Sequence, residues 1–304
     1  MKMGFLTNSL VNVGLKDLNS LAKWAKENDF VDLEVGPTVP LDEHEFHKAK
    51  ETYGVSINTM IYCRNFLSND KEQAEQLIAE LKKRIIFAGK IGAKQVVTTT
   101  GILDDSHKGG RYRPELSLEA FSRLFEPILE LAEASNVDIL LEACPFMGNI
   151  AVSPYMWDMI FDKIKSPRLG LAYDPSHLVW QSIDPYAPIY EFAGHIRHVH
   201  GKDCELNRDM IARTGTAHMY ASKGAWYHKD AGLPAESGHA NLWWRYRLPG
   251  LGELDWGKIL SRLYETGYDG TISIEHEDPV WEGDFDRVSR GVIASKEHIA
   301  QFFV

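Results

Sequence analysis

Four residues able to bind a metal ion stand at the ends of four apolar runs. They are Glu142 in DILLEACP, Asp174 in LGLAYDPSH, His200 in IRHVHGKD and Glu275 in TISIEHED. Each run is typical of a buried strand, where a carboxylate or an imidazole needs a compensating partner. Together they offer a mixed set of oxygen and nitrogen ligands. We therefore predict a divalent metal site and expect Mn²⁺, with Mg²⁺, Co²⁺ or Zn²⁺ as alternatives.

This ligand set predicts enolisation of a carbonyl compound. A cation bound by the four side chains leaves coordination positions for a substrate carbonyl and a neighbouring hydroxyl, and it stabilises an enediolate as a Lewis acid. Glu142 and Glu275 come from well-separated strands, so one removes a proton and the other returns it from the opposite face. Epimerisation, isomerisation and elimination share this first step, and the four ligands do not choose among them.

The elements that position these residues alternate along the chain. Short β-branched runs are followed by longer segments with apolar residues three and four positions apart, a pattern typical of βα units. The expected strands cover residues 3–10, 30–36, 55–63, 93–100, 137–144, 169–176, 195–203 and 270–277. The clearest expected helices cover 18–28, 71–92, 118–135 and 256–267. Eight units predict a single α/β domain over residues 1–304, folded as a (β/α)8 TIM barrel.

One stretch, at about 204–248, breaks this rhythm. The gap from His200 to Glu275 exceeds the two preceding gaps between ligands by more than 40 residues. The excess is rich in His, Trp, Tyr and Arg, which is unlike a disordered linker. We predict an ordered extension of the loop after the seventh strand, at the catalytic face. It would serve substrate binding, subunit contacts or both.

Charge and composition narrow the function classes. The net charge is −10 without a strongly basic segment, so nucleic acid is not expected as a partner. No run approaches the roughly 18 apolar residues of a membrane span. Three cysteines without a CxxC pair, together with an N-terminus that does not resemble a signal peptide, lead us to expect a cytoplasmic protein.

Four further residues are candidates for substrate binding. Lys202 shares a strand face with His200 and could bind an anionic group, or form an ion pair with an acid such as Glu277. His198 lies on that face too, as a core histidine or a substrate contact. Glu34 ends the second strand, and Arg247 lies in WWRYRLPG; each could equally be structural.

The sequence also resembles the xylose isomerase-like TIM barrels of the sugar phosphate isomerase/epimerase family, which includes ketose 3-epimerases and inosose dehydratases. The matching segments are GFLTNSL, LEVG, LLEACP, YDPSH, HVHGKD and ISIEHED. The resemblance implies that Glu142, Asp174, His200 and Glu275 bind the metal and that the two glutamates exchange protons with substrate carbon. It also implies that His177 contacts a substrate oxygen, and members of this group are often homo-oligomers.

Two departures separate the chain from the ketose epimerases. Those enzymes carry another Glu shortly after the first ligand, where this chain has CPFMGN, and an Arg at the position of Leu206. We expect a metal-dependent isomerase or epimerase of a carbohydrate or polyol. The alternative is a lyase or dehydratase acting on an inosose or a 3-oxo-glycoside, including C-glycosides. Two further hypotheses are a DNA-repair enzyme, which would need additional metal ligands and a basic groove, and a non-catalytic binding protein.

Overall fold

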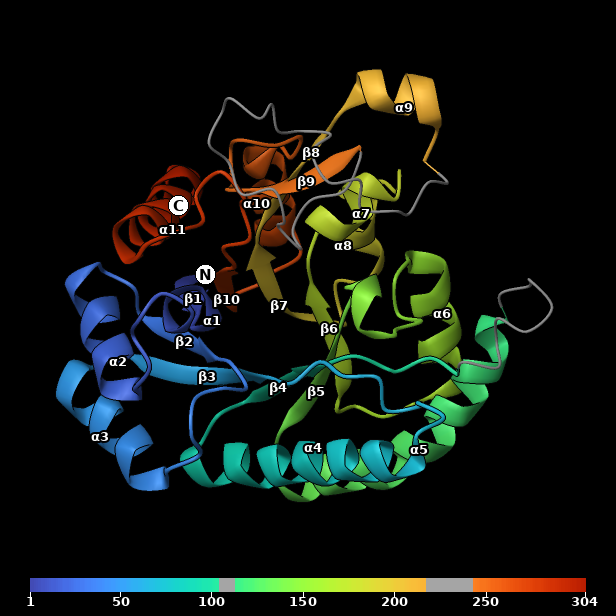
Figure 1. Cartoon of the computed structure of the whole chain (residues 1–304). Helices are drawn as coiled ribbons and strands as arrows, with labels where there is room; N and C mark the ends of the chain where they lie inside the picture. Colours follow the sequence, from blue (N-terminus) through green and yellow to red (C-terminus); the bar gives the residue numbers. More distant parts are fainter. Residues whose placement is uncertain (104–112, 217–242) are drawn as a thin grey trace.

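The chain forms a closed barrel of eight parallel strands surrounded by helices, shown as a computed structural model in Figure 1. The structure describes residues 1–103, 113–216 and 243–304. Around the ring the order is β1-β10-β7-β6-β5-β4-β3-β2. The strands are β1 (Lys2–Leu6), β2 (Asp32–Val35), β3 (Ser56–Ile61), β4 (Gln95–Thr98), β5 (Asp138–Glu142), β6 (Leu169–Tyr173), β7 (Ile196–Gly201) and β10 (Thr271–Ile274). The predicted TIM barrel is confirmed, and each predicted strand segment overlaps one barrel strand.

Helices follow the barrel strands and cover the outside of the ring. The long ones are α2 (Leu18–Glu27), α3 (Glu43–Tyr53), α4 (Lys71–Ile91), α5 (Pro114–Ala134), α6 (Pro154–Lys163), α10 (Trp256–Glu265) and α11 (Phe285–Ala300). Short helices are α1 (Asn8–Val11), α7 (Ser176–Trp180), α8 (Ala187–Glu191) and the 3-10 turn η2 (Pro145–Met147). The four predicted helices are confirmed. The left-handed residues Gly92 (φ 72°) and Asn136 (φ 54°) follow α4 and α5, as expected where helices end.

The first predicted strand is longer than the strand that forms. The apolar run continues to Leu10, but the backbone turns helical at Thr7, and α1 begins at the next residue. The Thr7 hydroxyl accepts a hydrogen bond from the Gly36 amide at 2.9 Å, which ties this turn to the end of β2. Leu10 is fully buried in the helix, so the hydrophobic pattern alone does not mark where the strand ends.

Strand alternation sorts the side chains into two layers. The larger core lies between the barrel and its helices and contains residues such as Leu33, Leu141 and Val199. A separate apolar cluster contains Leu6, Ile61, Cys63, Val97, Leu140 and Ala172. These come from neighbouring barrel strands with the same alternation, so they fill the barrel interior. The same alternation directs residue 142, two positions after Leu140, to the interior.

The extension after β7 begins with strand β8 (Asp203–Leu206) and ends with strand β9 (Trp244–Arg247). The two strands pair in antiparallel orientation. Helix α9 (Arg208–Thr214) follows β8. Figure 1 shows the pair and α9 together beyond the end of β7. The predicted insertion is therefore ordered at both of its ends. Residues 217–242, which include Trp226, lie outside the described residues.

Asp203 fixes this extension to the barrel. Its buried carboxylate accepts hydrogen bonds from the amides of Gly250 (3.1 Å) and Leu254 (3.1 Å) and from the indole of Trp256 (3.3 Å). The backbone approaches so closely that a Cβ on Gly252 would lie 2.2 Å from Asp203 Oδ1. A single carboxylate thus holds the segment between β9 and α10 against the start of β8.

Replacing Asp203 with alanine should destabilise the fold. The amides of Gly250 and Leu254 and the indole of Trp256 would lose their buried acceptor. We therefore expect the free energy of unfolding to fall by about 3 kcal/mol or more. Urea unfolding followed by circular dichroism measures it. Asp162→Ala is the control, since that side chain is 86% exposed and pairs with the surface residue Lys165. Equal stability of the two variants would contradict this role.

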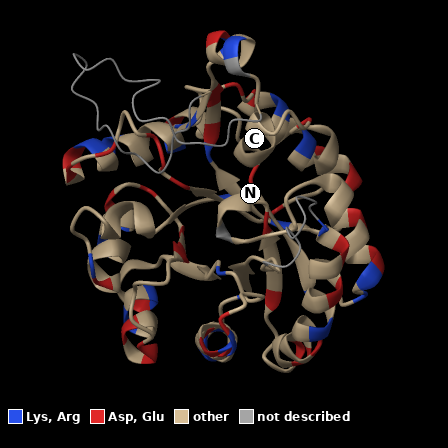
Figure 2. Cartoon of the chain, turned by 45° about the vertical axis from the view of Figure 1, so that its right-hand side comes forward, with Lys and Arg blue, Asp and Glu red and all other residues tan. Residues whose placement is uncertain are grey.

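The outer surface carries mixed charge. Figure 2 shows Lys and Arg interspersed with Asp and Glu along the surrounding helices. No helix in the described ranges is long and apolar enough to cross a membrane. The three cysteines, at positions 63, 144 and 204, are all free.

Candidate metal centre

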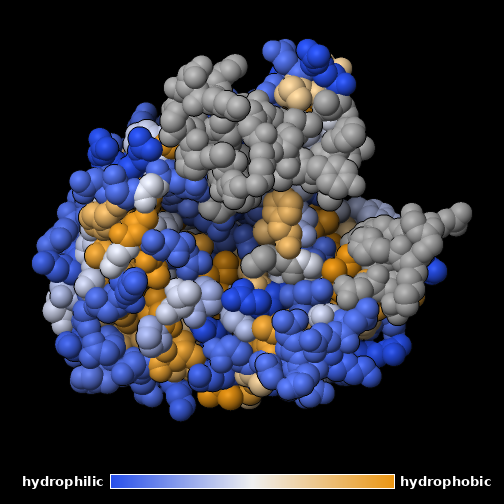
Figure 3. All heavy atoms as spheres, viewed as in Figure 1, coloured by the Kyte–Doolittle hydropathy of each residue, from blue (hydrophilic) through white to orange (hydrophobic). Residues whose placement is uncertain are grey.

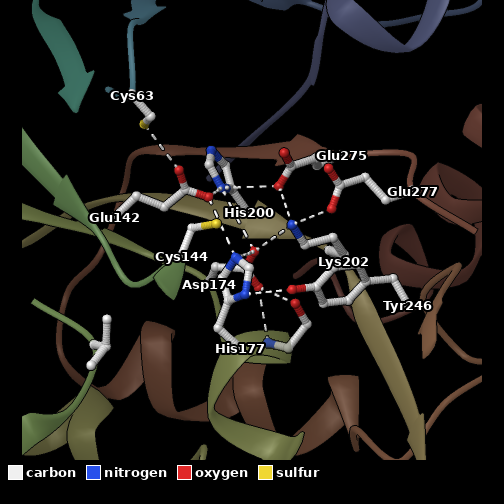
Figure 4. Close-up of polar contacts among 12 residues, drawn as sticks. Cys63, Glu142, Cys144, Asp174, His177, His200, Lys202, Tyr246, Glu275 and Glu277 are labelled. Atoms are coloured by element: carbon white, nitrogen blue, oxygen red, sulfur yellow. Dashed lines mark hydrogen bonds and ion pairs between the residues drawn. The ribbon is translucent and has the colours of Figure 1, made fainter. Parts of the chain in front are cut away.

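The structure brings the four predicted ligands to one point at the carboxyl ends of consecutive strands in the ring. Glu142 is the last residue of β5, Asp174 follows β6, His200 lies in β7, and Glu275 follows β10. One ligand atom from each lies within 4.8 Å of all the others, and all four residues are buried. Figure 4 shows these side chains pointing toward one another. Each strand alone carries one polar end, and barrel closure assembles them into a cluster.

The imidazole of His200 is at the centre of the cluster. Its Nδ1 atom lies 3.4 Å from Glu142 Oε1, 3.3 Å from Glu275 Oε2 and 3.9 Å from an Asp174 oxygen. Three carboxylates therefore surround one nitrogen. Such a set of oxygen atoms and one imidazole suits Mn²⁺, Co²⁺ or Zn²⁺.

Buried atoms without hydrogen bonds show that the cluster fits a cation. Asp174 Oδ2, His177 Nε2 and His200 Nδ1 are buried and make no hydrogen bond within the described part of the chain, although charged neighbours lie near them. Buried polar atoms are normally paired. A divalent cation among the four ligands would give the Asp174 and His200 atoms the partner that they lack.

A fourth carboxylate, that of Glu34, orients His200 from the opposite side of the imidazole ring. Glu34 on β2 lies 3.1 Å and 3.2 Å from His200 Nε2 through its two oxygens, and 2.9 Å from His198 Nε2. Burial would raise the pKa of Glu34, but the two histidines lower it well below its usual range. Because Glu34 occupies Nε2, His200 is left to present Nδ1 to the cluster. Carboxylates that bind a ligand histidine in this way fix its ring and its tautomer.

Substituting Glu34 tests this orienting role. Glu34→Gln should weaken Mn²⁺ binding by about 10- to 100-fold, the range typical for such partners of ligand histidines. Calorimetric titration of metal-free protein measures the affinity. Asp32→Asn is the matched control, because Asp32 is another buried acid of β2 that instead binds Asn58 and Thr271. An unchanged affinity in Glu34→Gln would refute the role.

Lys202 connects the cluster to a further acid. Its ammonium group donates to Glu275 Oε2 at 2.7 Å and to Glu277 Oε2 at 2.9 Å, and lies 3.0 Å from Asp174 Oδ2. The predicted ion pair with Glu277 is therefore present. Burial would lower the pKa of Lys202, but the three carboxylates raise it well above its usual range. Lys202 remains a buried cation that faces two candidate ligands.

His177 is positioned by a residue that the sequence analysis missed. Its Nε2 atom lies 3.2 Å from Asp174 Oδ2 and 3.6 Å from Glu142 Oε1, while its Nδ1 atom forms a 2.7 Å hydrogen bond with the Tyr246 hydroxyl. Tyr246 is on β9, inside the inserted segment, and its ring also lies 4.6 Å from the Lys202 ammonium. Side chains in WWRYRLPG alternate between two faces, with Arg245 and Arg247 on one face and Trp244 and Tyr246 on the other. This alternation was the sequence signal that could have identified Tyr246.

The two glutamates differ in their surroundings. Burial would raise the pKa of Glu142, but the neighbouring imidazoles of His177 and His200, 3.6 Å and 3.4 Å from Oε1, outweigh it and lower that pKa well below the usual range. Burial raises the pKa of Glu275 to about 7, although Lys202 opposes the rise. Cys63, another residue missed from sequence, donates a 3.2 Å hydrogen bond to Glu142 Oε2. The surroundings of Glu142 thus favour its ionised form, whereas burial favours the neutral form of Glu275.

A pocket of about 290 Å³ opens onto this cluster. Of the predicted site residues, Glu142, Glu275, His177 and Lys202 line it, whereas Asp174 and His200 are fully buried beside it. The remaining lining residues are Leu6, Asn8, Pro37, Ile61, Cys63, Arg64, Cys144, Phe146, Tyr246 and Glu277. Figure 3 shows hydrophobic residues at the surface beside the hollow on this face.

Three residues predicted to bind substrate do not line the pocket. Glu34 and His198 lie in the barrel interior and bind each other, so neither is open to a substrate. Arg247 pairs with Glu205 on the neighbouring strand β8 and donates to Asp278 Oδ2 at 2.9 Å. The strand alternation places Trp244 and Tyr246 on the buried face of β9 and leaves the arginines on the other face.

Fold and site together define an α/β barrel protein with a candidate metal centre at the carboxyl ends of its strands. The family model of the xylose isomerase-like TIM barrels matches residues 22–297. The chain therefore belongs to that family.

Individual proteins support this membership. The chain is 26% identical to the uncharacterized protein YfiH of Bacillus subtilis, over 91% of this chain and 93% of that protein. It is 22% identical to an inosose dehydratase of Geobacillus thermodenitrificans, over 84% of this chain and 81% of that enzyme. A crystal structure of the IolI protein with a bound zinc atom has a similar fold, with a TM-score of 0.73 at 15% identity, covering 100% of this chain and 99% of that one.

Proposed function

We propose that this protein is a divalent-metal-dependent isomerase or epimerase of a carbohydrate or polyol. The observation that carries the proposal is the convergence of Glu142, Asp174, His200 and Glu275 around buried atoms that lack hydrogen bonds. Membership of the xylose isomerase-like family agrees with it. We propose Mn²⁺ as the cation and a homo-oligomer as the working form.

Proton transfer is assigned to the two glutamates. When bound, the cation would act as a Lewis acid that stabilises the enediolate of the substrate. Glu142 and Glu275 come from β5 and β10, which are separated by β6 and β7 in the ring, so they approach from opposite sides. Glu142, kept ionised by its neighbours, removes a proton from the carbon next to the carbonyl. Glu275, on the other side of the ligand cluster, supplies or accepts the second proton.

The remaining polar residues of the pocket position the substrate. His177, fixed by Tyr246, faces the same point as the ligands and can donate a hydrogen bond to a substrate oxygen. Lys202 offers a positive charge beside Glu275 and can stabilise negative charge on a substrate oxygen. Glu34 and His198 take no part in substrate binding in this proposal. They hold His200 in place instead.

Deuterium exchange tests the proposal. The Mn²⁺-loaded protein is incubated in D₂O with ketoses, inososes and 3-oxo-glycosides, the metal is removed with a chelator, and the sugars are examined by NMR. We expect metal-dependent deuterium uptake at one carbon next to a carbonyl in at least one compound. A protein that holds metal and yet exchanges no proton in any of them would contradict enolisation.

Elimination is the second candidate function. It shares the first proton transfer with epimerisation, but the enolate then expels a hydroxyl or glycosyl group from the β carbon. The similarity to an inosose dehydratase favours it. In the same NMR experiment, an unsaturated product or a released aglycone would identify a lyase, while a deuterated epimer or isomer would identify the leading candidate.

A further inference from the structure

A large aromatic side chain is exposed at the mouth of the metal pocket. Phe146 lies in η2, four residues after Glu142, and lines the same pocket as Glu142 and Glu275. Its side chain is 52% exposed, although a phenyl ring is normally buried. It falls within CPFMGN, the stretch in which the chain departs from the ketose epimerases.

The ring is held in place by two buried indoles. Phe146 stacks on Trp180 with a centroid distance of 5.6 Å and an interplanar angle of 16°, and on Trp244 at 5.7 Å and 19°. The two tryptophans stack on each other at 5.0 Å and are 7% and 2% exposed. Trp180 is in α7 and Trp244 is in β9, so the extension after β7 helps to fix the Phe146 ring. The exposed part of Phe146 is thus a rigid apolar surface beside the pocket.

The exposed aromatic residues Tyr155 and Tyr190 do not lie beside the pocket. Tyr190 hydrogen-bonds to Glu265 and packs against the Arg262 guanidinium, so its position has a structural explanation on the outer surface. Tyr155 is 72% exposed on α6 and does not line the metal pocket. Phe146 differs because its exposed surface adjoins the candidate ligands.

We propose that Phe146 is a specificity-determining residue that binds a second ring joined to the reacting sugar. The substrate is then a glycoside or another two-ring molecule, and not a free monosaccharide. This inference rests on the proposed function and narrows its substrate class. Aromatic faces pack well against apolar ring surfaces, and the ring is already oriented by its neighbours.

The size of the pocket supports two separate subsites. Its volume of about 290 Å³ is at the small end of ligand sites, which typically span about 300–1,000 Å³. One sugar ring would occupy this space next to the ligands. A ring attached to it must extend to the rim, where Phe146 lies. A free monosaccharide would leave this hydrophobic surface in water.

Binding measurements test the inference without relying on catalysis. The Mg²⁺-loaded full chain is titrated with methyl β-D-glucoside, phenyl β-D-glucoside and cellobiose, and dissociation constants are obtained by ligand-observed NMR. We expect the wild type to bind at least one two-ring probe about five- to tenfold more tightly than the methyl glucoside. Comparison of the phenyl glucoside with cellobiose shows whether the second ring is aromatic or a sugar.

Variants identify the residue responsible. Phe146→Ala should remove most of the two-ring preference by weakening the binding of the two-ring probes far more than that of methyl glucoside, while Phe146→Tyr should retain the preference. Tyr155→Ala is the control, because it removes an exposed aromatic outside the pocket. The inference is overturned if the wild type shows no preference, or if Phe146→Ala keeps it. Deuterium exchange without such a preference would overturn the inference alone, whereas a preference without exchange would contradict only the enolisation chemistry.

Discussion

Glu142→Gln should lower metal-dependent deuterium exchange by roughly 10²–10⁴-fold, the usual contribution of a positioned general base. Glutamine keeps the shape of the side chain but cannot accept the substrate proton as a carboxylate does. Glu142 is suited to this role because the neighbouring imidazoles of His177 and His200 lower its pKa, and because the Cys63 thiol donates a hydrogen bond to Oε2 at 3.2 Å. The measurement is the rate of deuterium uptake by NMR, with the substrate found in the screen.

Loss of metal must be separated from loss of the base in this experiment. Glu142 is also a candidate ligand, so the exchange rate is measured at saturating Mn²⁺ and bound metal is determined alongside it. Glu130→Gln on the exposed face of α5 controls for the change in charge. If Glu142→Gln holds a full equivalent of metal and exchanges protons at the wild-type rate, another residue is the base.

Asp174→Asn should reduce the affinity for the cation by about 100-fold or more. Loss of a partner that merely orients a ligand costs up to about 100-fold, and a direct ligand should cost at least as much. The substitution is specific because Oδ1 accepts the Ser176 amide at 2.9 Å and its hydroxyl at 2.6 Å, and asparagine retains that oxygen. Only the charge on Oδ2, which faces His177 and Lys202, is removed.

A matched control exists for this substitution. Asp184 makes the same kind of local contact, with Oδ1 accepting the Tyr186 amide at 2.8 Å, but it is exposed and outside the site. Metal content after gel filtration and the rise in melting temperature on adding Mn²⁺ measure the effect, since a ligand stabilises only the state that binds it. Asp184→Asn should keep both. If Asp174→Asn also retains them, Asp174 is not a ligand.

Much of the fold follows from the chain's periodicity. The eight β-branched runs and the intervening helices have clear patterns, and a polar residue at the end of a buried run marks the carboxyl end of a strand. For this reason the sequence alone predicts that Glu142, Asp174, His200 and Glu275 lie together. The sequence does not predict where β1 ends, because Leu10 is apolar and buried although it lies in α1.

The roles of Glu34, His198 and Arg247 depend on tertiary geometry. Alternation predicts that Glu34 points into the barrel, but the stagger of the strands decides whether it reaches the pocket or lies beside the histidines of β7. Arg247 lies on β9, and the packing of Trp244 and Tyr246 decides which face of that strand is buried. Local sequence cannot determine either choice. Tyr246 and Phe146 were missed for the same reason, since both approach the pocket only through the folded loops.

A crystal structure of the Mn²⁺-loaded protein, with anomalous diffraction recorded at the manganese edge, tests the central claim most directly. The account predicts one strong anomalous peak with Glu142, Asp174, His200 Nδ1 and Glu275 at about 2.0–2.3 Å, and with Glu34 still on His200 Nε2. A peak elsewhere in the molecule would contradict it. So would a cation held without two or more of these four side chains.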